Sequence, residues 1–359
     1  MTPRFRSDLA NIQPYRPGRS IADVAAEFGI EQISKLASNE NPEPPFPEVQ
    51  QAIAAHVDSL NRYPDNAKPM LTAALAEHLG VPADRIWCGG ASNELTLITA
   101  LTMGGIDTSA VYAWPSFGLY RIGSLAILAS AIEVPLDAEH RHDLDSMRAA
   151  IREDTTVVYI CNPNNPTGTY VGGDALEAFI DSVADDVLIV VDEAYHEYAT
   201  APDYRSMVPL AAERDNVLVT RTFSKIYSLA GLRVGYAVTA PGNIAELRRI
   251  QLPFSVSNLA EVAAVEALQH QDRVAERRET NRAGIDSLTA GLRDRGIEVA
   301  DSQTNFIYAR FDDAGSVNDG LLQRGVIVRP VAPDGWLRIN TGTQPEMERF
   351  FTALDEILD

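Results

Sequence analysis

The chain of 359 residues is poor in lysine and cysteine and has no long apolar run. Lys35, Lys68 and Lys225 are its only lysines, so chemistry that needs a lysine amine has few candidates. The two cysteines, Cys88 and Cys161, show no paired spacing, which argues against a disulfide framework and favours a reducing compartment. The amino terminus lacks the apolar core of a signal peptide, and no stretch of about 18 apolar residues occurs. We therefore expect a cytoplasmic protein without membrane spans.

Positive charge is also in short supply. The sequence has 30 basic and 50 acidic residues, which gives a formal net charge of −20. Such a surface repels phosphate backbones and anionic lipids, so nucleic acid and membrane partners are not expected. An anionic ligand would have to be held by a local cluster of Arg, Lys, hydroxyl and backbone N–H groups.

The pattern of apolar residues predicts an α/β protein with two domains. Three runs, VVYI at 157–160, VLIVV at 187–191 and VLVT at 217–220, are apolar on both faces and alternate with helical segments. Strands of this kind form a parallel sheet between two layers of helices. A length of 359 residues also exceeds the size at which one core stops growing.

The character of the sequence changes after about residue 250. A long charged helical region from Ser257 to Gly296 is followed by shorter strands and a last helix from Pro345, which predicts a smaller α+β domain. Residues 1–30 are rich in Arg and Pro and predict an arm that packs on another part of the molecule or on a partner subunit. We divide the chain into an arm (1–30), a large domain (31–250) and a small domain (251–359).

Lys225 lies just beyond the third strand, where parallel-sheet enzymes bind ligands. Ser224 and Arg233 are close by, and a hydroxyl and a guanidinium fork suit phosphate oxygens. A solvated lysine beside a surface ion pair is the alternative. The segment from Gly89 to Asn93 offers a second phosphate cradle, because Ser92 and Asn93 would stand at a helix start with free N–H groups; a plain capped helix has the same pattern.

Two further polar positions follow the other two strands. Asn165 lies in the turn-rich segment CNPNNPTGTY and either binds a ligand oxygen or belongs to a simple Asx-Pro turn. Asp192 follows five apolar residues and needs a cationic or hydrogen-bonding partner, such as a protonated ring nitrogen, with Tyr195 three residues further on. A metal ligand or a helix cap is the alternative, but no second carboxylate or His cluster at metal-ligand spacing accompanies it, so we predict no metal site.

Taken together, the segments resemble the fold-type I pyridoxal-phosphate aminotransferases, and within them the histidinol-phosphate aminotransferase branch. The resemblance spans nearly the whole chain and implies a mostly parallel seven-stranded sheet in the large domain. Seven motifs occur in the order of that family: KLASNENP (35–42), NRYPD (61–65), GGASNEL (89–95), NPNNPTG (162–168), DEAY (192–195), TFSKIYSLAGLRVGY (222–236) and LRINTGT (337–343).

The resemblance implies a role for each candidate residue. Lys225 would carry pyridoxal 5′-phosphate as a Schiff base and act as general base and acid. Asp192 would pair with the pyridine nitrogen, and Arg338, helped by Asn39, would bind the substrate carboxylate, although a structural ion pair is the alternative for Arg338. Further cofactor contacts would come from Asn165 and Tyr195 at the ring oxygen, Phe117 on the ring face, Ser92, Asn93, Ser224 and Arg233 at the phosphate, and Tyr63 from the second subunit of a homodimer with shared sites.

The substrate is the least determined point. Family members that act on histidinol phosphate commonly place tyrosine hydroxyls where this chain has Phe117 and Phe254. The loss of two hydroxyls favours an apolar pocket, so the sequence predicts amino transfer between an aromatic amino acid and 2-oxoglutarate, as in the phenylalanine aminotransferases. Tyr15 and Arg329 keep histidinol phosphate as the alternative substrate. A pyridoxal-phosphate β-lyase and a non-enzymatic effector-sensing domain share the fold and are further alternatives.

Overall fold

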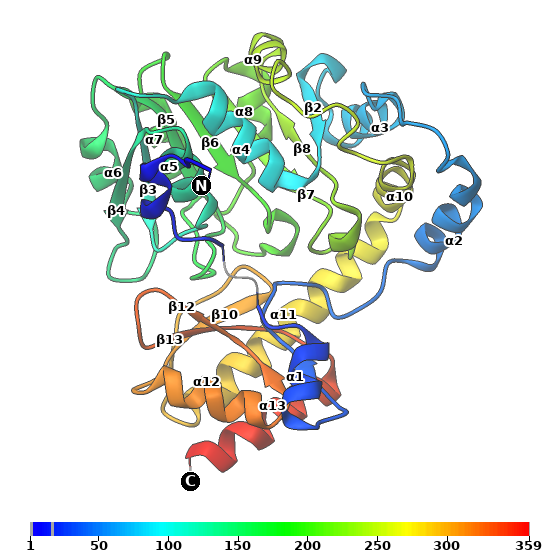
Figure 1. Ribbon diagram of the computed structural model, residues 1–359, viewed down its shortest axis with the longest axis vertical. Helices are drawn as coiled ribbons and strands as arrows, with labels where there is room; N and C mark the ends of the chain where they lie inside the picture. Colours follow the sequence, from blue (N-terminus) through cyan, green and yellow to red (C-terminus); the bar gives the residue numbers. More distant parts are fainter. Residues whose placement is uncertain (1–2, 16–17, 359) are drawn as a thin grey trace.

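The computed structural model describes residues 3–15 and 18–358, which form a large domain, a smaller domain below it and an arm that touches both (Figure 1). Among these residues, no helix is both long enough and apolar enough to span a membrane.

A twisted seven-stranded sheet forms the centre of the large domain, in the order β2-β8-β7-β6-β5-β3-β4. Strand β8 runs antiparallel to both of its neighbours, β2 and β7, and the other neighbouring pairs in this sheet are parallel. The strands are β2 (Ile86–Gly89), β3 (Ser109–Trp114), β4 (Ser130–Pro135), β5 (Thr155–Cys161), β6 (Leu188–Asp192), β7 (Val217–Thr222) and β8 (Gly235–Val238). The three predicted apolar runs are the central strands β5, β6 and β7, and the predicted fold class is confirmed.

Alternate residues of the central strands enter two separate apolar cores, which explains why these strands are apolar on both faces. In β5, Val157 and Tyr159 pack on one side of the sheet, and Val158 and Ile160 pack on the other. The first side is covered by α4 (Ala91–Met103), α5 (Leu119–Ala126) and α9 (Pro241–Leu247). The second is covered by α2 (Pro47–Ala55), α3 (Pro69–Leu79), α6 (Leu144–Ala150), α7 (Gly173–Ser182), α8 (Val208–Glu213) and α10 (Asn258–Leu268).

The predicted helix start at Ser92 and Asn93 and the predicted helical region after Ser257 are both present, with differences in their bounds. Helix α4 begins one residue before Ser92. Helix α3 ends at Leu79 and is followed by Gly80 in the left-handed region (φ 67°), which glycine adopts without strain. The charged region from Ser257 to Gly296 is not one helix but two, α10 and α11 (Gln271–Arg293), which are separated at Gln269 and His270.

The small domain has a four-stranded sheet in the order β12-β13-β10-β9, with α11, α12 (Ala314–Gln323) and α13 (Gln344–Leu358) packed on it (Figure 1). Its strands are β9 (Glu298–Val299), β10 (Phe306–Arg310), β12 (Arg329–Val331) and β13 (Trp336–Asn340). A short parallel pair joins β1 (Ser34–Lys35) to β11 (Val326–Ile327), so the chain enters the small domain once before it builds the large one.

The amino-terminal arm contacts both domains. Arg6, next to the short helix η1 (Ser7–Asn11), donates to the carbonyl of Ala126 at the end of α5 (2.9 Å). Helix α1 (Ile21–Phe28) instead packs its buried Val24 against the small-domain core. The domain boundaries after residues 30 and 250 stay predictions.

Candidate active site

A cavity of about 270 Å³ opens at the carboxyl ends of β5, β6 and β7, between the two domains. The ends of three neighbouring parallel strands meet at one edge of the sheet, so polar residues that follow them lie together. The cavity brings together twelve of the predicted site residues: Tyr15, Asn39, Ser92, Asn93, Phe117, Asn165, Asp192, Tyr195, Ser224, Lys225, Arg233 and Arg338.

Asp192, the last residue of β6, is a buried carboxylate (3% exposed) without an ion pair among the described residues. Its Oδ2 accepts from the hydroxyl of Tyr120 (2.9 Å) and its Oδ1 from the backbone N–H of Ala194 (3.2 Å). Burial raises the pKa of Asp192, while these hydrogen bonds act in the opposite direction. A buried carboxylate that faces a cavity and lacks a cation fits the protonated nitrogen of a bound ring.

Lys225 is half-buried in the same cavity, three residues after the end of β7. Burial, with the nearby charges of Arg338 and Arg233, lowers the pKa of Lys225 to about 8. Its Nζ lies 5.5 Å from the centre of the Tyr195 ring. Near neutral pH, Lys225 therefore has a much larger fraction of neutral, nucleophilic amine than an exposed lysine.

Arg338 of β13 connects the small domain to the loop after β5. Its guanidinium donates to Oδ1 of Asn165 (2.6 Å) and to the carbonyl of Ala37 (2.6 Å), while its Nε has no acceptor among the described residues. An arginine with an unpaired donor beside a polar cavity fits a carboxylate or phosphate oxygen. Asn39 donates to the Tyr195 hydroxyl (2.6 Å), which leaves the proton of that hydroxyl for a ligand oxygen.

A third group of residues fits a phosphate. Gly90, the N-cap residue of α4, has no side chain to accept from the N–H groups of the first turn, where Ser92 and Asn93 lie. The Ser224 hydroxyl is 3.5 Å from an Arg233 guanidinium nitrogen. Gly235 permits the amino end of α4 to lie close to β8, because a Cβ there would lie 2.8 Å from the backbone nitrogen of Ser92. Hydroxyls, a guanidinium and a helix terminus thus converge on one end of the cavity.

Three predicted site residues do not line the cavity. Tyr63 and Phe254 stack on each other at the surface, with ring centres 4.8 Å apart. Tyr63 is 82% exposed and Phe254 is 42% exposed. Arg329 lies on β12, with its guanidinium 5.9 Å from the ring of Tyr15. The Arg329–Tyr15 contact places a cation next to the cavity mouth.

The sequence interpretation missed several residues around the cavity, above all Tyr120 and Asn164. Asn164 accepts from the Ser116 hydroxyl (2.7 Å) and donates to the Pro115 carbonyl (3.1 Å), so it ties the loop after β3 to the loop after β5. Two features of the sequence could have indicated these residues: the hydroxyl of Tyr120 in WPSFGLY and the amide of Asn164 in NPNNPTG. Polar groups of this kind need hydrogen-bond partners when they are buried.

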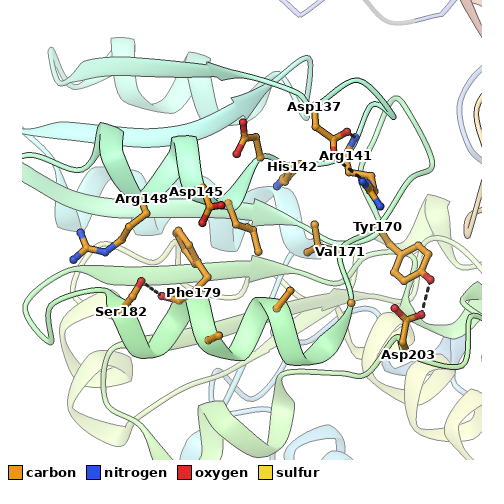
Figure 2. Close-up of a pocket in the computed structure, with 15 residues that line it drawn as sticks. Asp137, Arg141, His142, Asp145, Arg148, Tyr170, Val171, Phe179, Ser182 and Asp203 are labelled. Atoms are coloured by element: carbon orange, nitrogen blue, oxygen red, sulfur yellow. Dashed lines mark hydrogen bonds and ion pairs between the residues drawn. The ribbon is translucent and has the colours of Figure 1, made fainter.

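Figure 2 shows a larger hollow, of about 630 Å³, between α6 and α7. At its rim, Tyr170 donates to Asp203 (2.6 Å) and Arg141 pairs with Asp137 (2.9 Å). None of the predicted site residues lines it, so the smaller cavity at the sheet edge is the candidate active site.

Comparisons with known proteins agree with this geometry. The family model for aminotransferase class I and II matches residues 31–354. Histidinol-phosphate aminotransferase 1 of Dechloromonas aromatica is 43% identical over 97% of this chain and 96% of its own length. The histidinol-phosphate aminotransferase of Moorella thermoacetica is 42% identical over 99% of this chain and 93% of its own. Histidinol-phosphate aminotransferase from Sinorhizobium meliloti, solved in complex with pyridoxal-5′-phosphate, superposes with a TM-score of 0.91 at 27% identity, over 100% of this chain and 98% of its own.

The predicted aromatic amino acid substrate is wrong, because the relatives at 38–44% identity are named histidinol-phosphate aminotransferases. The prediction rested on the missing hydroxyls of Phe117 and Phe254. Phe254, however, lies outside the cavity of its own chain, and Arg338 and Tyr15 still supply donors there. Two absent hydroxyls therefore do not make the cavity unsuited to an anion.

Proposed function

We propose that this protein is a histidinol-phosphate aminotransferase. The chain belongs to the class I and II aminotransferase family, has the fold-type I fold and uses pyridoxal phosphate as its cofactor. The observation that carries the proposal is the nearly full-length identity to enzymes of that name. The cavity supports it, since its polar walls include Arg338 and Tyr15 in addition to the groups that suit the cofactor.

We assign the cofactor contacts from the geometry of the cavity. Asp192 would pair with the ring nitrogen, Phe117 would cover one face of the ring, and Asn165 and Tyr195 would contact its oxygen. The phosphate would bind Ser92, Asn93, Ser224 and Arg233. When bound, pyridoxal phosphate supplies an electron sink for the carbanion left when the α-proton is removed.

Lys225 would move that proton. Its amine would hold the cofactor, and its Nζ would accept the proton from the substrate carbon and return it on the cofactor side. The lowered pKa of Lys225 fits this task, because the neutral amine is the form that accepts a proton.

The substrates would meet the guanidinium groups at the mouth of the cavity. A 2-oxo acid presents a carboxylate. In histidinol phosphate, a CH2 group that carries a phosphate ester takes the place of the amino acid's carboxylate. Arg338, whose Nε has no acceptor among the described residues, would hold either anion. Arg329, beside Tyr15, would add positive charge for the doubly charged phosphate.

We also propose a homodimer with shared active sites, in which Tyr63 reaches the cofactor phosphate of the other subunit. The segments that carry the exposed Tyr63–Phe254 stack hold other exposed apolar residues, which a second copy would cover. These residues are Val57, Leu60, Met70, Ile250 and Leu252.

The choice of substrate is tested by steady-state kinetics with 2-oxoglutarate as the amino acceptor. We expect kcat/KM for histidinol phosphate to exceed that for phenylalanine by at least about tenfold, because the guanidinium groups gain a doubly charged partner. Equal values, or a preference for phenylalanine, would contradict the proposal. A loss of the preference in Arg329→Ala, with phenylalanine turnover unchanged, would locate the phosphate contact.

A further inference from the structure

Tyr120 connects two residues that would hold the cofactor ring, and no motif in the sequence assigned it a role. It lies in the first turn of α5 and is completely buried. Its hydroxyl donates to Oδ2 of Asp192 (2.9 Å). Its ring packs edge-on against Phe117, with centres 5.7 Å apart at 87°, and stacks on Tyr159 of β5, with centres 4.7 Å apart at 11°.

The contact with Asp192 has a chemical consequence. Burial raises the pKa of Tyr120, so its phenol stays protonated and remains a donor. The Asp192 carboxylate accepts a hydrogen bond from the backbone N–H of Ala194 and another from the side-chain hydroxyl of Tyr120. A donor to a carboxylate stabilises its ionised form. The anionic form of Asp192 is the one that keeps a ring nitrogen protonated.

The contact between Tyr120 and Phe117 holds a second residue of the cavity in place. Phe117 lies in the loop after β3 and lines the cavity. The T-shaped contact with the Tyr120 ring restricts the movement of the Phe117 ring. One buried side chain thus supports the residue at the face of the ring and the residue at its nitrogen.

We propose that Tyr120 is a positioning residue for the cofactor ring: it orients the Asp192 carboxylate, keeps it ionised and packs against Phe117. The proposal rests on the assigned role of Asp192 and not on the substrate, so it stands or falls separately from the preference for histidinol phosphate.

The test compares Tyr120→Phe with Tyr159→Phe in the holoenzyme. The two tyrosines are buried and stacked on each other, and each substitution removes one hydroxyl. The Tyr159 hydroxyl has no hydrogen-bond partner among the described residues, so Tyr159→Phe is a matched control. A hydrogen bond to a charged group is strong enough that we expect Tyr120→Phe to lower kcat and cofactor affinity by about 10- to 100-fold, and Tyr159→Phe to change them by less than about twofold.

A spectroscopic measurement separates positioning from packing. The absorbance of the bound cofactor, titrated with pH in the absence of substrate, should show loss of the ring proton at lower pH in Tyr120→Phe and no change in Tyr159→Phe. In the Asp192→Asn background, Tyr120→Phe should have no further effect on the spectrum, because Tyr120 acts through the Asp192 carboxylate.

Three results would overturn the proposal. Equal losses in the two Phe variants would indicate packing alone. A Tyr120→Phe spectrum identical to wild type at every pH would show that the hydroxyl does not act on Asp192. A Tyr120→Phe protein that fails to fold while Tyr159→Phe folds would make the hydroxyl a structural group instead of a positioning one.

Discussion

Lys225→Ala is expected to lower kcat by at least about 10³-fold, because general acid–base catalysis alone contributes roughly 10²- to 10⁴-fold and the covalent attachment of the cofactor is lost as well. The half-buried amine in the cavity has a pKa lowered to about 8, which suits both roles. Borohydride treatment should fix the cofactor to the wild-type chain at Lys225 and leave the variant unlabelled.

Lys35→Ala is the matched control for this substitution. Lys35 pairs with Glu40 (2.9 Å) and does not line the cavity, so its loss should leave labelling intact and kcat within about twofold, as for most surface substitutions. Labelling of Lys225→Ala at another lysine, or retention of more than a tenth of the wild-type kcat, would remove Lys225 from the mechanism.

Asp192→Asn is expected to lower kcat by about 10²- to 10³-fold, because a neutral amide cannot pair with a protonated ring nitrogen and breaking a buried ion pair costs about 3–5 kcal/mol. The effect on folding should be in the opposite direction. Asp192 is buried without an ion pair among the described residues, so replacing its charge by an isosteric amide should leave the apoprotein at least as stable.

Thermal unfolding with and without pyridoxal phosphate distinguishes these effects. At a fixed cofactor concentration, the rise in Tm grows with the logarithm of the cofactor's affinity for the folded chain. The rise should therefore be smaller in Asp192→Asn than in wild type, while the apoprotein Tm is unchanged or higher. A variant with the full cofactor-dependent rise in Tm and a kcat within about twofold of wild type would contradict the role of Asp192.

Much of the cofactor end of the cavity could be predicted because it follows from strand order. Asn165, Asp192 and Lys225 each follow an apolar run, and parallel strands bring their carboxyl ends together without further information. The two cores explain the apolar runs themselves.

The residues that were missed depend on tertiary contacts. Tyr120 is 72 residues from Asp192 in sequence, and no periodicity shows that α5 turns its first residues toward the end of β6. Likewise, nothing in LPFSVS shows that Phe254 packs on Tyr63 instead of entering the cavity. The substrate was predicted wrongly because two absent hydroxyls were counted without the donors that Arg338 and Tyr15 supply from the small domain and the arm.

The most direct measurement is a single turnover of the purified holoenzyme with histidinol phosphate and no oxo acid. The account predicts that the visible absorbance of the cofactor is lost on mixing and returns when 2-oxoglutarate is added, which is the behaviour of an enzyme that stores the amino group between two half-reactions. An absorbance that histidinol phosphate leaves unchanged, while phenylalanine removes it, would contradict the account.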